Sequence, residues 1–352
     1  MKRVRLGVVG AGRLGGFHSS KAASNPEVDF VGVSDVCEEN RKRVASQWNV
    51  REFATVEELL LNVDAVIVAA PSVLHAEIGR KVLMAGKHLL VEKPATTTGA
   101  SALELAEIAK ARGLVMQVGH VEQHNPAWKA AKQYLADVVS GAVPAYIDAS
   151  RTSGYTFRST DVGATFDLMI HDLELVLSLI PSPIVRVSAF GVAQFGGYED
   201  ASYATLEFEN GSVARLKASR IEMEAVRQMT VRTASQSIFV DFAARSAKRV
   251  CPKREILEGA YSPENVTYAQ MAPRVKTFMQ EEYEVEELVR DPFDALELEM
   301  KDFVSAILRG TPSVVPGERA ARAVQVGEMI VRDLQARASR AQNAPVHTLK
   351  VA

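Results

Sequence analysis

Three glycines near the beginning of the sequence, Gly10, Gly12 and Gly15, have the spacing G-x-G-x-x-G. They follow the apolar run 4–9 and precede residues 13–24, whose composition favours a helix. In such a turn the first glycine permits a tight bend, the second lets a ligand approach the backbone, and the third lets the helix pack closely on the strand. Free N–H groups at the start of a helix attract phosphate. The pattern therefore predicts a binding site for the pyrophosphate of a dinucleotide.

An aspartate, Asp35, ends the second predicted strand, twenty residues after Gly15. A carboxylate in this place accepts hydrogen bonds from ribose hydroxyls and repels a 2′-phosphate. We therefore predict NAD rather than NADP as the cofactor. Arg41 and Lys42 lie close by in the sequence. They either tolerate a phosphate or lie on a solvated helix face, and the sequence leaves both interpretations open.

Two more turns end predicted strands, Ala69-Ala70-Pro71-Ser72 with His75 and Glu92-Lys93-Pro94. Ligands of open α/β sheets bind at the carboxyl ends of the strands. A lysine followed by proline, which fixes the backbone, can direct its ammonium group into that cleft. By position alone, a ligand-facing lysine and a surface lysine are equally plausible. The candidate cofactor-binding residues are Gly10, Gly12, Arg13, Leu14, Asp35, Ala70, Pro71, His75, Glu92 and Lys93.

A second group of reactive side chains lies in residues 165–180, where Asp167 and His171 are four positions apart. Residues with this spacing share one face of a helix. An imidazole, with an ordinary pKa of about 6.5, can act as a base near neutral pH. Glu174 and Ser178 continue the same stripe, so a solvated helix face is the alternative interpretation. The rest of this helix is strongly apolar, which favours a functional role for His171.

The elements that must position these residues fall into two parts, because 352 residues are too many for one ordinary core. In the first part, strands and helices alternate, and each strand is a continuous apolar run. This pattern predicts a doubly wound parallel sheet covered on both faces. We predict strands at 4–9, 30–34, 65–69, 88–91 and 115–118, and helices at 13–24, 38–47, 56–61, 73–85 and 100–112.

The pattern changes near residues 120–125, which predicts an α/β domain over 1–122 and a second domain over 123–352. In the second part apolar residues recur with period two, and Asn210-Gly211 is a strong hairpin signal. An antiparallel sheet in an α+β domain follows. We predict strands at 145–150, 185–193, 203–209, 212–221, 227–233 and 237–242, and helices at 125–138, 165–180, 294–309 and 318–338.

The composition excludes several classes of protein. A hydrophobic fraction of 47%, a charged fraction of 24% and a net charge of −2 do not indicate a nucleic-acid or membrane-surface binder. No apolar stretch is long enough to span a bilayer, and the start lacks the pattern of a secretory leader. Cys37 and Cys251 have neither metal nor disulfide spacing, so we expect a reduced, cytoplasmic setting. His120, Glu122 and His124 do not form a convincing ligand set, and we predict no metal.

Taken together, the glycine turn, Asp35, the Ala-Pro-Ser turn, Glu92-Lys93-Pro94 and the Asp-x-x-x-His pair resemble the Gfo/Idh/MocA oxidoreductases. The resemblance extends over essentially the whole chain, including the helix that begins after Pro316-Gly317. It implies an N-terminal Rossmann domain and a C-terminal α+β domain with a large open antiparallel sheet. It also implies NAD-dependent oxidation of sugars, cyclitols or nucleotide sugars. We expect the C-terminal helix to pack back near the first domain.

The resemblance also implies roles for three residues. His171 is expected to be the general base, Asp167 to contact a neighbouring substrate hydroxyl or orient the site, and Lys93 to hydrogen-bond the reacting oxygen. In some family members the lysine carries the proton, so the division between Lys93 and His171 stays open.

A finer resemblance connects the chain to one subgroup. Gly119-His120-Val121-Glu122, Asn125-Pro126 and residues 158–163 match a subgroup that includes UDP-N-acetylglucosamine 3-dehydrogenases. Gln123-His124 stands where that subgroup usually has Arg-Phe, which puts the exact substrate in doubt. A free-sugar or inositol-type dehydrogenase is the alternative within the family, and a non-catalytic dinucleotide-sensing regulator is the alternative outside enzymes.

Three residues before the catalytic helix, Arg151, Tyr155 and Arg158, are candidate substrate-binding residues. A guanidinium group suits a diphosphate, although a flexible surface loop explains the same residues equally well. A large sheet face seldom stays open in a monomer. We therefore expect a homodimer or a homotetramer, with a small-molecule substrate and no nucleic-acid or membrane partner.

Overall fold

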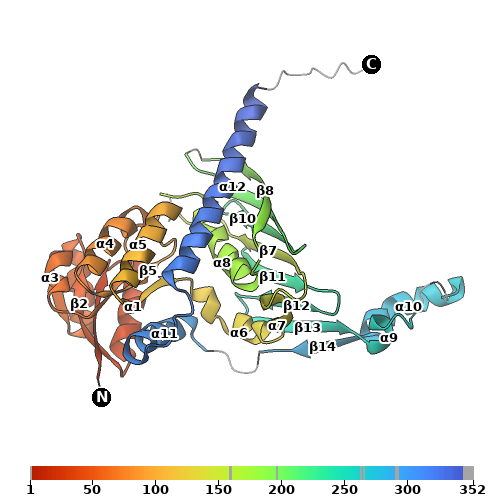
Figure 1. Cartoon of the computed structure of the whole chain (residues 1–352), viewed down its shortest axis with the longest axis horizontal. Coiled ribbons are helices and arrows are strands. Elements are labelled where there is room, and N and C mark those ends of the chain that lie inside the picture. Colours follow the sequence, from red (N-terminus) through yellow and green to blue (C-terminus); the bar gives the residue numbers. More distant parts are fainter. Residues whose placement is uncertain are drawn as a thin grey trace.

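The computed structural model describes residues 2–157, 161–195, 197–261, 264, 266–289 and 293–343, with only the backbone for 340–343. The chain forms two sheets (Figure 1). In the first sheet six parallel strands have the order β3-β2-β1-β4-β5-β6. They are β1 (Val4–Val9), β2 (Val28–Ser34), β3 (Arg51–Phe53), β4 (Ala65–Val68), β5 (His88–Glu92) and β6 (Met116–Gly119).

Helices cover this parallel sheet, as the continuous apolar strands predict. The central strand β4 and the edge strand β6 are fully buried, since every residue of both is buried. The strand order reverses between β1 and β4, and ligands of such sheets bind in the crevice at this point. The helices of this half are α1 (Arg13–Ser24), α2 (Glu38–Trp48), α3 (Val56–Leu60), α4 (His75–Met84) and α5 (Gly99–Ala111), with a short η1 (Ser72–Leu74) before α4.

The second sheet has eight strands in the order β14-β13-β12-β11-β7-β10-β9-β8. The predicted antiparallel arrangement is confirmed for every pair except β7 and β10, which run parallel because helices separate β7 from the later strands. Gly211, with φ +83°, turns the predicted hairpin between β9 and β10. The strands are β7 (Tyr146–Thr152), β8 (Ile184–Val192), β9 (Ala201–Phe208), β10 (Val213–Ser219), β11 (Val226–Arg232), β12 (Ser237–Asp241), β13 (Ser246–Pro252) and β14 (Tyr283–Glu287).

Helices between the two sheets lead the chain from one to the other. The η2 turn (Val121–His124) follows β6, then α6 (Pro126–Lys132) and α7 (Ala136–Val139). A π-helical segment, η3 (Thr165–Met169), runs directly into α8 (Ile170–Leu179), which packs on β7 and β10. The short α9 (Arg254–Leu257) and α10 (Tyr268–Glu281) extend away from the rest of the chain beyond β13 and β14 (Figure 1).

Two late helices connect the halves. α11 (Ala295–Arg309) packs against α1 and β1 of the first half. α12 (Gly317–Asn343) contacts α5 of the first half and both α8 and β8 of the second (Figure 1). Among the described residues, no helix is both long and apolar enough to cross a membrane.

Candidate active site

The glycine turn has the geometry of a phosphate cradle. Gly10 has φ +94°, and a Cβ there would lie 2.5 Å from the carbonyl oxygen of Ala69. A Cβ on Gly15 would lie 1.7 Å from the carbonyl oxygen of Gly10, so helix α1 packs on the turn too closely for any side chain. A Cβ on Gly12 would meet no atom within 4 Å, and no side chain caps α1. The start of α1 therefore presents free N–H groups to open space, which fits a pyrophosphate.

Asp35 lies directly after β2 and is fixed to this turn. Its Oδ2 accepts a 2.6 Å hydrogen bond from the Ala11 N–H, and its Oδ1 accepts one of 2.7 Å from the Cys37 N–H. A carboxylate has four lone-pair sites, so two remain for ribose hydroxyls.

The nearby basic residues are engaged elsewhere. Arg41 donates to the Asp35 carbonyl oxygen and lies 3.3 Å from Glu52, and Lys42 pairs with Glu38 at 2.5 Å. These contacts favour the interpretation that both bases belong to the helix surface rather than to a phosphate site.

His75 ties together the loops that follow β4 and β5. Its Nδ1 lies 2.8 Å from the carbonyl oxygen of Pro94, and its Nε2 lies 2.9 Å from that of Ala70. The ring is buried. His75 therefore fixes the backbone on both sides of the crevice, with the exposed Pro71 at its rim.

Lys93 and Asp167 meet across the boundary between the two sheets. The Lys93 Nζ donates to the Asp167 carbonyl oxygen at 2.6 Å and to Oδ1 at 3.2 Å. Both side chains are 16% exposed, so the pair is accessible from one side only. The lysine of the first half and the acidic residue of the second thus form one cluster, although 74 positions separate them in the sequence.

Asp167 and His171 lie on different kinds of helical turn. The sequence predicts one α-helix over 165–180, but Asp167 belongs to the π-helical η3 and His171 to the first turn of α8. A π turn contains an extra residue, which rotates Asp167 relative to His171 compared with an ordinary four-residue spacing. Such segments are frequent at functional sites.

The His171 ring is only partly exposed, and its Nδ1 is buried without a hydrogen-bond partner among the described residues. Burial lowers the pKa of His171 well below its usual range, and the positive charges of Lys93 and Arg151 lower it further. The imidazole is therefore neutral at pH 7 and able to accept a proton.

A further histidine, His120, lies beside His171. Their ring centroids are 6.1 Å apart with an angle of 87° between the planes. His120 is 1% exposed, and neither of its nitrogens has a partner in the described part of the chain. From the sequence, His120 was considered as a metal ligand and as part of the subgroup match, but not as a site residue. Its position directly after β6, next to β5, which ends directly before Lys93, was the signal that could have placed it at the site.

Glu92 is buried behind Lys93. Its Oε1 lies 2.7 Å from His18 Nε2, and its Oε2 accepts from the Lys93 N–H at 3.2 Å. Burial opposes the charge of Glu92, but the hydrogen bond and charge of His18 together with the charge and N–H of Lys93 outweigh it and hold the pKa of Glu92 below its ordinary value. Glu299 lies in the same cluster without a partner, and burial with the charge of Glu92 raises its pKa well above the usual range. Glu299 therefore holds its proton to a higher pH than an ordinary glutamate does.

The candidate substrate residues have different surroundings. Arg151 is buried, and it donates to Asp172 at 2.9 and 3.1 Å and to Glu122 at 2.8 Å. Tyr155 packs against Phe195, with ring centroids 4.5 Å apart. Arg158 lies outside the described residues.

The stripe that follows His171 is not a solvated face. Glu174 is fully buried, and its carboxylate accepts hydrogen bonds from Gln123 at 2.8 Å and from Arg319 of α12 at 2.6 Å. Gln123 also donates to Ser178 at 2.8 Å. The glutamine at the position of the usual arginine is thus part of a closed network in which Arg319 supplies the positive charge.

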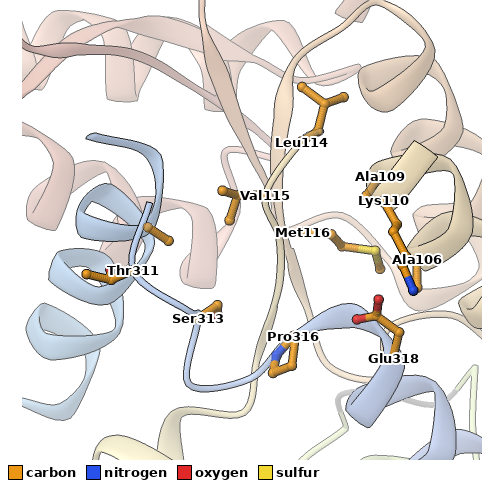
Figure 2. Close-up of a pocket in the computed structure, with 11 residues that line it drawn as sticks. Ala106, Ala109, Lys110, Leu114, Val115, Met116, Thr311, Ser313, Pro316 and Glu318 are labelled. Carbon is orange, nitrogen blue, oxygen red and sulfur yellow. The ribbon is translucent and has the colours of Figure 1, made fainter. Parts of the chain in front are cut away.

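Two hollows lie near the boundary between the sheets. One, of about 270 Å³, lies between α5, β6 and the residues before α12, with Met116 and Pro316 in its wall (Figure 2). None of the candidate site residues lines it. The other, of about 610 Å³, is lined by loops after β4 and β5, by Gly163 and Phe166 beside Asp167, and by α12. Its position next to η3 makes it the hollow that adjoins the cluster.

Two family models match the chain. The model described as "Oxidoreductase family, NAD-binding Rossmann fold" matches residues 4–120, and the model of the GFO/IDH/MocA C-terminal domain matches residues 138–238.

Individual proteins are similar as well. UDP-N-acetylglucosamine 3-dehydrogenase of Acidithiobacillus ferrooxidans is 38% identical over 242 residues, 69% of this chain and 75% of that protein. Its solved structure has a TM-score of 0.81 at 30% identity and covers 96% of this chain and 99% of its own. The scyllo-inositol 2-dehydrogenase (NAD(+)) of Bacillus subtilis is 28% identical over 62% of this chain and 68% of that protein.

Proposed function

We propose that this chain, which belongs to the Gfo/Idh/MocA family of NAD-binding oxidoreductases, transfers a hydride between a secondary hydroxyl of a nucleotide sugar and NAD. The observation that carries the proposal is the cluster in which Lys93, directly after β5 of the first half, meets Asp167 of η3, with His171 in the following first turn of α8. A protein that only senses a dinucleotide does not need this cluster.

The cofactor site is proposed from the shape of the crevice. Bound NAD supplies the acceptor for the hydride that leaves the substrate carbon. The N–H groups at the start of α1 bind its pyrophosphate, with Arg13 and Leu14 at the exposed edge, and Asp35 accepts the ribose hydroxyls. The rest of the proposed NAD site is bordered by Ala70 and Pro71. His75, bonded to the Ala70 carbonyl, and Glu92, which accepts from the Lys93 N–H, hold this border in place.

The proposed catalytic roles follow from charge and burial. His171 is neutral. Because its Nδ1 is buried, Nε2 is the nitrogen that accepts the proton of the substrate hydroxyl. The Lys93 ammonium donates to the reacting oxygen and stabilises negative charge that develops there. Asp167 holds Lys93 in place through two oxygens and presents its second carboxylate oxygen to a neighbouring hydroxyl.

The nucleotide-sugar substrate rests on the relative that oxidises UDP-N-acetylglucosamine at position 3. The matching stretch before α6 supports the same choice, and Arg319 supplies the charge that the altered Gln123 lacks. Inositol is the second candidate substrate, because an inositol dehydrogenase is also among the relatives. Tyr155 is proposed to border the substrate site, whereas Arg151 supports it from beneath.

Three further properties belong to the proposal. Residues 1–122 bind the cofactor, and 123–352 bind the substrate and form the contacts of a homodimer or homotetramer. The exposed Phe190 and Tyr203, paired on β8 and β9 of the eight-stranded sheet, support such an assembly. Both cysteines, Cys37 and Cys251, are free, which supports a reducing, cytoplasmic setting.

Two variants test the catalytic assignment. His171→Ala and Lys93→Ala should each lower turnover of UDP-N-acetylglucosamine by about 10²- to 10⁴-fold, the range of a general acid or base. Absorbance at 340 nm measures turnover, and titration with NAD measures cofactor affinity, which should stay nearly unchanged. Lys110→Ala, at a lysine that lines the other hollow, is the matched control and should remain fully active. Near-normal turnover in both site variants would falsify the catalytic assignment. Turnover of inositol but not of the UDP-sugar by the unmodified enzyme would replace the nucleotide sugar by inositol as the proposed substrate.

A further inference from the structure

Two adjacent imidazoles contain three unpartnered nitrogens. Nδ1 of His171 and both ring nitrogens of His120 are buried, and none has a hydrogen-bond partner within the ranges the structure describes. A buried polar group without a partner costs about 1–3 kcal/mol, so native proteins seldom leave such groups unsatisfied. Unpartnered nitrogens on each of two adjacent rings call for an explanation that links the two rings.

The geometry of the pair fits one intervening water. The rings meet edge to face, with centroids 6.1 Å apart. Because a ring nitrogen lies just over an ångström from its centroid, this separation is too long for a direct hydrogen bond. A water with two hydrogen bonds of about 2.8 Å bridges atoms roughly 4–5.5 Å apart, and the 6.1 Å between the ring centroids allows such a separation. Buried waters commonly satisfy polar groups of this kind.

We propose that His120 is the positioning partner of His171, linked to its Nδ1 through a single bridging water. The inference rests on the proposed role of His171 as the base. The water accepts the Nδ1–H of His171 and donates to a nitrogen of His120. This arrangement fixes the tautomer in which Nε2 is unprotonated and faces the substrate, and it stabilises the imidazolium after Nε2 has taken the hydroxyl proton. His171 keeps that proton, and none moves to His120.

The neighbouring carboxylates are already occupied. Asp172 and Glu122 both accept from Arg151, and Glu92 is bonded to His18. His120, whose ring contacts that of His171, is therefore the acceptor still available to it.

The charges around the pair keep His120 an acceptor. Burial lowers the pKa of His120 to about 3, and the charges of Lys93 and Arg319 act in the same direction. His171 faces Lys93, Arg151 and Arg227, which also oppose protonation. His120 therefore stays neutral over the whole pH range of an activity assay and always offers one lone pair.

The test compares His120→Leu with His120→Asn, which retains a hydrogen-bonding group. For His120→Leu we expect kcat to fall about 10- to 100-fold, as with the loss of partners that orient metal-bound histidines, while KM for UDP-N-acetylglucosamine stays within about threefold. The acid limb of the kcat–pH profile should move to lower pH, because the imidazolium has lost its partner. His120→Asn should stay within about tenfold of the unmodified enzyme, with the limb in place.

His124→Leu is the matched control. His124 lies four residues further on and is also buried; its Nε2 has no hydrogen-bond partner among the described residues and lies 4.0 Å from Asp302 Oδ2, and burial lowers its pKa to about 4. It makes no ring contact with His171 among the described residues, so the variant should leave the pH profile unchanged.

Each result supports or overturns the inference. A rise in KM at constant kcat in His120→Leu would show direct contact with the substrate instead. An unchanged profile would show that the two rings act independently. If the leucine variant does not fold, a loss above about 100-fold in His120→Asn overturns the idea, and retention supports it. An inactive His171→Ala beside a normal His120→Leu would leave the proposed function intact and remove only the water link.

Discussion

Replacing Arg151 by methionine tests how the buried charges beneath the active site are held. Arg151 lies on β7, is 3% exposed and binds Asp172 of α8 and Glu122 of η2. Methionine retains much of the length and the packing over the Phe242 ring, whose centroid lies 5.6 Å from the guanidinium carbon. The substitution leaves two buried carboxylates without their cation. Removal of one member of a buried ion pair typically costs about 3–5 kcal/mol, and we expect this loss at pH 7.

The loss should depend on pH in a defined direction. Burial raises the pKa of Asp172 even while Arg151 is present, so removal of the guanidinium raises it further. A folded carboxyl with a raised pKa holds a proton that the unfolded chain releases, and stability therefore falls as pH rises. The slope is about 1.4 kcal/mol per pH unit for each carboxyl. Between pH 5 and pH 7 the penalty should grow by about 2–3 kcal/mol if one carboxyl titrates.

Urea unfolding at both pH values measures these quantities. The triple variant Arg151→Met, Glu122→Gln, Asp172→Asn should recover most of the stability, because no charge remains to be compensated. A loss below about 1 kcal/mol at pH 7, or the same loss at pH 5, would refute the reasoning. A folded Arg151→Met protein with a raised KM would instead show that Arg151 binds the substrate, as the sequence first suggested.

Two further predictions concern single carboxyl groups. Asp35→Asn keeps the shape of the side chain but removes its charge and one of the two oxygens that accept from Ala11 and Cys37. The ratio of kcat/KM for NAD over NADP should therefore fall about tenfold or more, and an unchanged ratio would contradict the role of the charge. Burial and the charge of Glu92 raise the pKa of Glu299, so the enzyme should lose stability as pH rises above about 4.5. Glu299→Gln should flatten this dependence and be the more stable protein at pH 8 in urea unfolding. Lower stability of the variant at pH 8 would count against the raised pKa of Glu299.

Local patterns in the sequence were sufficient for five of the six strands of the first sheet, whereas the short edge strand β3 was missed because only Phe53 in it is buried. The five predicted strands are continuous apolar runs, and Gly10, Gly15 and Asp35 occur at spacings that few other structures require. Lys93 could be placed at the carboxyl edge, but its contact with Asp167 could not, because that contact depends on how two sheets pack against each other.

The second sheet was harder to predict. Strands β13 and β14 lie at its edge and carry charged residues on both faces, so their period-two pattern is weak. The π-helical turn at Asp167 leaves no mark in composition, and the stripe through Glu174 looks solvated unless Arg319, 145 residues away, is known to cover it. His120 was missed for a similar reason, since an orphaned imidazole is visible only when every neighbour is in place.

Helix α12 has a consequence for how the enzyme opens. Its 27 residues extend for about 40 Å, and it rests on α5 of the nucleotide half and on α8 and β8 of the other. Because α12 packs on both halves, a rotation that moved the halves apart would break its contacts with one of them. Local movement of loops at the crevice would leave this packing intact, so we expect ligands to enter and leave by such movement rather than by a hinge between the halves.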